Sequence, residues 1–520
     1  MSSIIKKVIN FEKINIKNII SKTSKVEKSS FITTICLGLI THMFMFVNVL
    51  PNWDSMYNFK SNNIWLQMGR WFLGQSMEIS SSFDLPWIIG LLSIFFLGIA
   101  SAIVVNVLEV KKISTAITIS AIIVTFPALT STFSYLFLAD GYMLGILLAS
   151  LAVLITKKYN KGYYIAGIIL AFSLGIYQTN ISFAVLLSLL IIVMNLLNPS
   201  KDIIDNIKYA MRFVIMSLIG LIIYFVTLKI LTKIAGQGIA SYQGGNEGFA
   251  INIQTILNIL TEFKSCFTII TGGSNKFLIF LVLILFLCLF IMLVHIIILN
   301  KIYKNVWKMI LIVISLAAIP FITGFAYFIS NNTIYHMVMR MSWSLLFVAI
   351  ILLVEKISLR KSINTFIKQV FFYFPTIITW VIIWNFMLVA NISYINMYQR
   401  YEKEYALALR LVDRIEMNDE YTESIPVLFL GTPYTHKTEN IYNNNIKYIT
   451  GADGNVILVN DFHFKQFIKY YLGVDLSYAN GDQVDKVMNS PEITKIKSFP
   501  NKNCVQVIDG VMVVKLSDIY

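Results

Sequence analysis

Charged residues are scarce in this sequence. They account for 13% of its 520 residues, whereas hydrophobic residues account for 57%. Soluble domains average about 25% charged residues, and no soluble fold can bury so large a share of apolar side chains. The composition therefore excludes an ordinary soluble protein and indicates that most of the chain faces lipid.

Cysteines and nucleotide-binding motifs are also lacking. The four cysteines are widely spaced, which argues against a disulfide framework and against a cysteine-based metal site. The glycine-rich stretch at residues 244–248 lacks the Gly-Lys-Ser/Thr ending of a phosphate-binding loop, which disfavours a transport ATPase. The formal charge is +14, but the basic residues lie in short gaps between apolar runs instead of on one polar face. We therefore expect no nucleic-acid partner.

Long apolar runs are what the sequence has in abundance. Eleven of them approach the roughly 20 residues that cross a bilayer as a helix. They lie at residues 30–51, 85–108, 113–133, 134–156, 162–178, 179–198, 209–235, 276–299, 305–329, 341–359 and 370–390. The pattern predicts an α-helical polytopic membrane protein with about eleven transmembrane helices in residues 30–390, after a basic N-terminal tail at residues 1–29.

The gaps between these runs alternate in their content of lysine and arginine. One set of gaps, which includes the N-terminal tail, is rich in both, whereas the other set has few although it contains the longer loops. Cytoplasmic loops of membrane proteins carry the excess of lysine and arginine. We therefore predict a cytoplasmic N-terminus and outer loops at residues 52–84, 236–275 and 330–340. An odd number of spans places the C-terminus outside as well.

The last 130 residues have a different character. Residues 391–520 contain 13 Lys and Arg against 16 Asp and Glu, and long apolar runs give way to short ones. Helical patterns lie at 394–418, 461–472 and 482–489, and strand-like runs lie at 427–430, 456–459, 505–508 and 511–514. The Asp509-Gly510 pair between the last two runs is typical of a hairpin turn. We predict a small C-terminal extracytoplasmic α/β domain at residues 391–520.

Ionisable residues in the outer loops are the first candidates for chemistry, because a charge beside a membrane span needs a reason to be there. Asp54 follows the first span by three residues and could act as a general base, or else be a solvated loop residue or a helix N-cap. Residues 61–77 predict a helix lying in the interface that carries Arg70, and residues 251–265 suggest a second one. Arg70 and Arg340 could each bind phosphate, although Arg340 suits a snorkelling anchor equally well.

Several further outer residues could contact a sugar. They are Asp140, Tyr142, Tyr177, Gln178, Tyr242, Glu247 and His336. A tyrosine ring offers a face to pyranose C–H groups, and amides and carboxylates offer hydrogen-bonding groups. Alternatives stay open for three of these positions. Asp140 either faces a polar cavity or caps a helix that starts at Gly141. Tyr177-Gln178 could instead form only a tight turn, and His336 could be a solvated loop residue.

Short motifs within residues 30–400 resemble a known family. They are Asp54 just after the first span, Gly69-Arg70-Trp71, the stretch from Phe126-Pro127-Ala128 to Asp140-Gly141-Tyr142, and the pair Tyr177-Gln178. Together they resemble the bacterial membrane glucosyltransferases of the Gtr type II kind. The resemblance implies a GT-C type fold in the bacterial cytoplasmic membrane and a polyprenyl-phosphate hexose donor, with glucose as the expected sugar. The acceptor would be an extracytoplasmic glycan such as O-antigen or a wall polymer.

The same resemblance implies that Asp54 is the base. Attack opposite the lipid phosphate would invert the anomeric centre, and Arg340 or Arg70 would stabilise the departing phosphate. No cofactor is confirmed. Metal dependence is open, because Asp54, Asp140 and Glu247 would surround a divalent ion only if the fold brings them together.

Two other classes compete with this interpretation. A lipid-linked oligosaccharide flippase, or another polysaccharide-export membrane protein, should line its central cavity with cations in mid-span, and these spans contain almost none. A secondary transporter should show related halves and broken, charged helices at mid-membrane depth, and the sequence shows neither.

Overall fold

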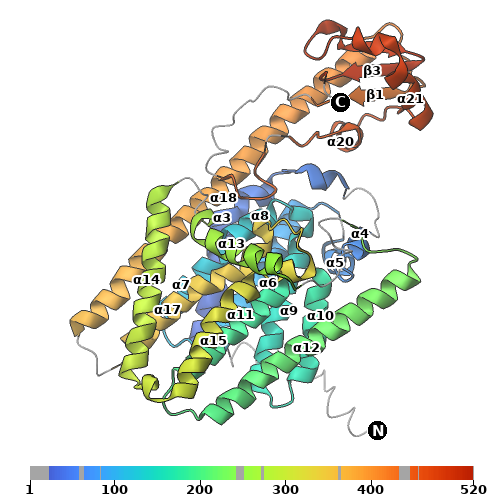
Figure 1. Ribbon diagram of the computed structural model, residues 1–520. Coiled ribbons are helices and arrows are strands. Elements are labelled where there is room, and N and C mark those ends of the chain that lie inside the picture. The colour runs from blue at the N-terminus through green and yellow to red at the C-terminus, as the bar shows by residue number, and fades with distance from the viewer. Residues whose placement is uncertain are drawn as a thin grey trace, which may run out of the picture.

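Long apolar helices dominate the computed structural model (Figure 1), which describes residues 23–57, 64–81, 83–241, 251–270, 275–360, 365–432, 446–454 and 456–518. Each of the eleven apolar runs contains a helix. The long ones are α3 (Lys25–Val47), α6 (Pro86–Val107), α9 (Ala139–Lys158), α12 (Ile203–Ile234), α14 (Lys276–Leu299), α15 (Val306–Thr323) and α18 (Thr365–Glu416). Helix α17 (Ser344–Ser358) joins this group because it continues the 3₁₀ helix Met337–Trp343. The shorter ones are α7 (Ile113–Thr125), α8 (Pro127–Phe133), α10 (Tyr163–Ile176) and α11 (Asn180–Leu196).

Fewer helices are long and apolar enough to cross a membrane than the sequence predicts. Across the described residues, eight helices are long and apolar enough to span a membrane, or nine if the pair α7 and α8, bent by 44° at Pro127, forms one span. Helices α10 and α11 have only 14 and 17 residues. The chain is a polytopic membrane protein, and the predicted count of about eleven is not established.

The centre of the bundle is α17, which is buried along nearly its whole length. At one of its ends, both oxygens of the buried Glu355 accept backbone hydrogen bonds, from Lys111 at 3.0 Å and Lys112 at 2.9 Å. A buried histidine of α3 joins two other helices, because the His42 ring contacts the Tyr394 hydroxyl of α18 at 2.6 Å and the Val124 carbonyl of α7 at 2.8 Å. Buried polar groups are therefore used here to hold helices together.

Helix α18 is far longer than a membrane span. Its 52 residues extend for roughly 78 Å, whereas the hydrocarbon core is about 30 Å thick. The sequence predicted a span at 370–390 and a separate helix at 394–418, and this separation was wrong, because helical hydrogen bonding continues without a break between them. In Figure 1 α18 runs out of the bundle to the C-terminal unit, the described residues that follow it.

The C-terminal unit contains a three-stranded sheet of β1 (Val427–Leu430), β2 (Val505–Ile508) and β3 (Val511–Lys515), in the order β1-β3-β2. Strand β1 is parallel to β3, and β2 pairs with β3 as the antiparallel hairpin predicted at 509–510. Alternate residues of β1 and β3 enter two hydrophobic clusters, one with residues of α18 and α20 (Asp461–Phe467) and the other with Val487 of α21 (Gly481–Asn489). Burial of both faces explains why these strands read as continuous apolar runs.

Two local predictions were wrong. Residues 456–459 form no strand, because the backbone N–H groups of Ile457 and Leu458 donate instead to the buried Glu404 carboxylate of α18, at 3.1 and 2.9 Å. The interfacial helix at 61–77 is broken into α4 (Ile64–Gln67) and α5 (Leu73–Met77). The second predicted outer-loop helix is present as α13 (Ile253–Ile269).

Candidate active site

The three loops predicted to lie outside meet around one cavity of about 700 Å³. We call it the acidic cavity because it contains Asp54. Its walls come from the 3₁₀ helix Trp53–Tyr57, the turn after α4, the turn between α10 and α11, the end of α12 and the segment before α17. Six of the sequence-predicted site residues line it: Asp54, Arg70, Tyr142, Tyr177, Gln178 and His336. The fold therefore brings together residues separated by up to 282 positions in the sequence.

Asp54 is held at the cavity by a turn that its neighbours form. The Asn52 side chain accepts the Ser55 backbone N–H at 3.1 Å and donates to the Ser134 carbonyl at 2.7 Å, which ties this turn to the end of α8. Burial raises the pKa of the Asp54 carboxyl above its ordinary value, and the positive charge of Arg70 opposes that shift. A carboxylate with a raised pKa is a stronger base than an exposed one.

Arg70 directly follows Gly69, which forms a turn that no other residue type could form at that position. Gly69 has a φ of +73°, and a Cβ there would lie 2.6 Å from Gln178 Nε2 and 2.8 Å from the Tyr224 hydroxyl. Those same groups fix the turn, because Gln178 donates to the Met68 carbonyl at 2.8 Å and Tyr224 donates to the Gly69 carbonyl at 3.0 Å. This turn is the reason that the predicted interfacial helix breaks.

Two stacked tyrosines form an aromatic wall beside Arg70. The rings of Tyr142 and Tyr177 are 4.6 Å apart with an interplanar angle of 13°. The Arg70 guanidinium lies 5.0 Å from the centre of the Tyr177 ring and 6.0 Å from that of Tyr142, which is within cation–π range. His336 completes the set of predicted residues, and burial together with the charges of Arg340 and Arg70 lowers its pKa. The acidic cavity thus combines a carboxylate, a guanidinium and aromatic faces.

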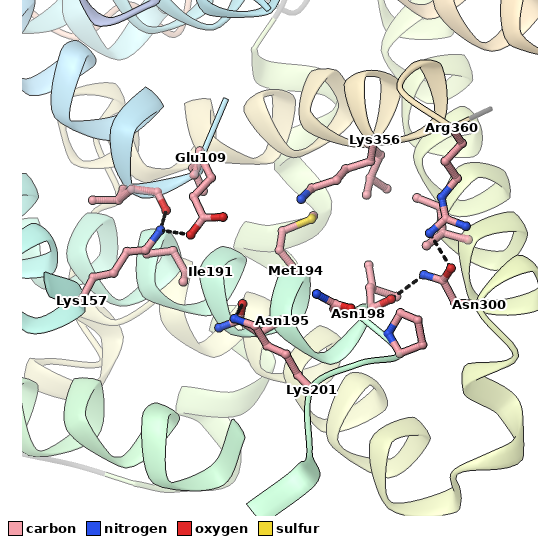
Figure 2. Close-up of a pocket in the computed structure, with 16 residues that line it drawn as sticks. Glu109, Lys157, Ile191, Met194, Asn195, Asn198, Lys201, Asn300, Lys356 and Arg360 are labelled. Carbon is pink, nitrogen blue, oxygen red and sulfur yellow. Dashed lines mark hydrogen bonds and ion pairs between the residues drawn. The ribbon is translucent and has the colours of Figure 1, made fainter. Parts of the chain in front are cut away.

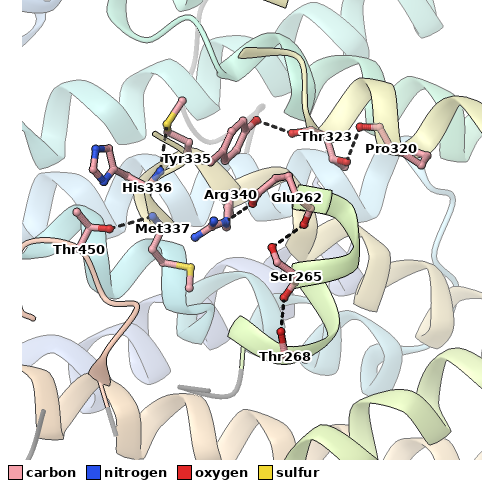
Figure 3. A network of polar contacts seen from close by, with 11 residues as sticks. Glu262, Ser265, Thr268, Pro320, Thr323, Tyr335, His336, Met337, Arg340 and Thr450 are labelled. Atoms are coloured by element: carbon pink, nitrogen blue, oxygen red, sulfur yellow. Dashed lines mark hydrogen bonds and ion pairs between the residues drawn. The ribbon is translucent and has the colours of Figure 1, made fainter. Parts of the chain in front are cut away.

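Arg340 has different surroundings from those expected. It does not line the acidic cavity, and its Nε donates to Glu262 Oε1 of α13 at 2.6 Å, where both side chains are at most 9% exposed. Figure 3 shows this pair beneath the segment that carries Tyr335 and His336. The guanidinium also lies 5.1 Å from the Trp343 ring centre. The pair anchors α13 to the segment that enters α17.

The remaining predicted residues are not at the cavity or cannot be placed. Asp140 is fully buried in the first turn of α9, where its Oδ1 accepts the Gly141 N–H at 2.8 Å, and it does not line the acidic cavity. Tyr242 and Glu247 lie outside the described residues. In the part of the chain that the structure describes, no three His, Cys, Asp or Glu side chains come close enough to hold a metal ion.

Sequence reasoning missed a contribution from the C-terminal unit. Thr450 lines the acidic cavity. Its carbonyl accepts the Ser131 hydroxyl at 2.7 Å, and its own hydroxyl accepts the Met337 N–H at 3.0 Å, a contact visible in Figure 3. The next residue, Gly451, has a φ of +91°, and a Cβ there would lie 2.7 Å from the Tyr135 ring. Residues 446–454 thus pack tightly against the bundle, and no local pattern in the sequence predicts this contact.

Comparison with known families gives this arrangement a context. Residues 43–349 match the family described as Glucosyl transferase GtrII. The chain belongs to the GtrII glucosyl transferase family. No curated protein and no solved structure shows significant similarity to the chain. The match confirms the predicted resemblance and establishes a membrane glucosyltransferase. All six predicted residues at the acidic cavity fall inside the matched region, whereas Thr450 falls outside it.

Proposed function

We propose that this GtrII family member transfers glucose from a polyprenyl-phosphate donor to an extracytoplasmic glycan, with Asp54 as the general base. The observation that carries the proposal is that Asp54 and Arg70 line one cavity. The reaction needs a base for the acceptor hydroxyl and a cation for the departing lipid phosphate. A carboxylate and a guanidinium in one partly apolar space meet both needs.

The chemical step follows from these two groups. Asp54 accepts the proton of the acceptor hydroxyl while that oxygen forms a bond to the anomeric carbon. The bond between the anomeric carbon and the phosphate oxygen breaks, and the electron pair stays on the lipid phosphate. Arg70 stabilises the added negative charge with charge-assisted hydrogen bonds. Attack from the side opposite the phosphate inverts the anomeric centre.

The surroundings of the two arginines favour Arg70 as the group that meets the phosphate. Arg340 is engaged by Glu262, so its charge is largely matched within the protein. Arg70 lies at the cavity beside the tyrosine pair. We therefore assign the donor phosphate to Arg70 and a positioning role to Arg340. The aromatic faces of Tyr142 and Tyr177 suit the hexose, and Gln178 positions the Arg70 turn.

The flippase alternative fits the acidic cavity less well. A flippase needs several cations along the path of a lipid diphosphate, whereas Arg70 is the one lysine or arginine among the described residues that line this cavity. We base the orientation on the gaps that are rich in lysine and arginine, which belong on the cytoplasmic side. The N-terminus then lies in the cytoplasm, and the acidic cavity and the C-terminal unit lie outside the bacterial inner membrane. In this orientation Thr450 of the C-terminal unit lines the acidic cavity on the outer side of the membrane.

The test is transfer of labelled glucose from polyprenyl-phosphate glucose in membranes, with wild type compared with Asp54→Asn at matched expression. Losing a positioned general base should lower the rate about 10²–10⁴-fold. Asp84→Asn is the matched control, because Asp84 belongs to the same outer loop and burial raises its pKa to about 6, yet it does not line the acidic cavity. Equal losses in both variants, or none in Asp54→Asn, would remove Asp54 from the mechanism.

A further inference from the structure

A second cavity, of about 260 Å³, lies at the other end of α9. Tyr142 near the start of α9 lines the acidic cavity, and Lys157 near its end lines the second one. About 15 residues of helix separate them, which corresponds to roughly 22 Å. The two cavities are therefore separate sites near opposite ends of the bundle. The second one lies among the gaps that are rich in lysine and arginine.

The second cavity is strongly cationic, and we call it the basic cavity. It is lined by Lys157, Lys201, Lys356 and Arg360, and Glu109 is the one carboxylate among the described residues around it. Figure 2 shows these side chains around one space, with the Lys356 ammonium directed into it. Like charges repel, so four cations around one cavity are unfavourable unless anions compensate for them.

Part of this charge has a structural explanation. Lys157 Nζ donates to the Val107 carbonyl at 2.6 Å and to Glu109 at 2.8 Å. Lys201 donates to Asn195 Oδ1 at 2.7 Å, and Arg360 donates to Asn300 Oδ1. Cations near the carbonyl ends of helices are stabilised by the helix dipole. These contacts account for how three of the four cations are held.

No contact of this kind with the described part of the chain holds the Lys356 ammonium in place. Within the described residues, no hydrogen bond or ion pair joins its ammonium to another side chain or to a carbonyl, although its charge acts on Glu109 across the cavity. It lies one turn before Arg360 on the chain, so both cations approach the cavity from the end of α17. An ammonium directed into a cationic space is a donor available to an incoming anion.

The walls indicate what kind of anion fits. Ile191, Met194 and Leu353 supply apolar surface next to the cations, as a ligand with a charged head and a hydrocarbon part requires. The volume is well below that of the acidic cavity, which suits a headgroup and not a sugar-bearing lipid. Basic pockets between helix ends on the lysine-rich side of a membrane protein recognise anionic headgroups.

We propose that the basic cavity binds a phosphate group, carried by an anionic phospholipid of the surrounding leaflet. The same chemistry would accept free inorganic phosphate, so the test must separate the two sources. Each lysine or arginine near an anionic headgroup contributes roughly fivefold in affinity. The site is independent of the glucosyl transfer assigned to the acidic cavity.

The experiment uses the purified full-length chain, stripped of lipid in detergent. Retention of added phosphatidylglycerol and phosphatidylcholine is measured by native mass spectrometry. We expect wild type to retain phosphatidylglycerol selectively, and the combined variant Lys201→Gln, Lys356→Gln and Arg360→Gln to bind it on the order of a hundredfold more weakly. The control is Lys158→Gln with Lys161→Gln, because these exposed lysines lie on the same side of the bundle but do not line the cavity.

A second variant keeps the proposal testable if the combined variant does not fold. Lys356→Gln removes an ammonium that makes no hydrogen bond or ion pair with the described residues. It should weaken phosphatidylglycerol binding about fivefold, with an unchanged melting temperature in lipid-free detergent. Stabilisation of wild type, but not of Lys356→Gln, by millimolar inorganic phosphate would support the site and identify free phosphate as a sufficient ligand. Equal lipid retention by wild type, Lys356→Gln and the control, with no effect of phosphate, would overturn the proposal.

Discussion

Two short segments each carry an arginine at the same end of the bundle, and the two arginines have different surroundings. The turn at Gly69-Arg70 presents its guanidinium to the acidic cavity beside two tyrosine rings. The segment at 335–343 directs Arg340 into a buried pair with Glu262, away from the cavity lining. The residue type is the same, but the partner decides whether the charge serves a ligand or the fold. Removing Arg340's partner should therefore affect stability, and removing Arg70 should affect the reaction.

The largest effect is expected from breaking the buried pair. Glu262→Gln leaves the Arg340 charge buried and unmatched, which costs about 3–5 kcal/mol when one partner of a buried ion pair is removed. The melting temperature in detergent, or the denaturant midpoint where unfolding is reversible, measures this loss. We expect it to fall well below that of wild type.

The control for that prediction replaces both partners. Glu262→Gln combined with Arg340→Met removes the unmatched charge, and it should recover much of the stability lost in the single variant. If Glu262→Gln alone is as stable as wild type, the pair has no anchoring role, and Arg340 becomes a candidate for the donor phosphate again.

The next effect is expected at Arg70. Arg70→Gln should lower glucosyl transfer about 10²–10³-fold, the loss typical of removing one group that stabilises developing negative charge. Its melting temperature should stay closer to that of wild type than that of Glu262→Gln, because Arg70 is only half-buried whereas the Arg340–Glu262 pair is buried on both sides. A variant that loses stability and activity together would contradict the contrast between the two arginines.

The smallest effect is a displacement of the pH profile. Asp54 must be deprotonated to act as a base, so kcat/KM should fall as the pH drops through its pKa, which burial raises. The charge of Arg70 lowers that pKa. Arg70→Gln should therefore move the acid limb of the profile to higher pH, whereas Arg70→Lys, which keeps the charge, should leave it in place.

A different titrating group could produce such a limb. His336 also lines the acidic cavity, and its pKa is lowered. The profile of His336→Gln distinguishes the two groups. If the acid limb disappears in that variant, the limb belongs to the histidine and the assignment to Asp54 fails.

Local patterns in the sequence were informative wherever one segment decides its own structure. Each apolar run contains a helix, and Asp509-Gly510 closes a hairpin. The choice of Asp54, Arg70 and the tyrosine pair also came from the sequence, through short motifs and their predicted side of the membrane. Local reasoning failed where a distant group competes for the backbone, as Glu404 does for the N–H groups of Ile457 and Leu458.

The sequence by itself determined that the chain lies mostly in a membrane, that its basic gaps alternate and that a carboxylate follows the first span. These properties depend on composition and on spacing along the chain. Only the tertiary structure decided that Arg70 lines the acidic cavity while Arg340 pairs with Glu262, and that Thr450 reaches a site some 400 residues upstream. The physical reason is that the role of a charge depends on which partner lies within a few ångströms of it, and such partners come from elements far apart in the sequence.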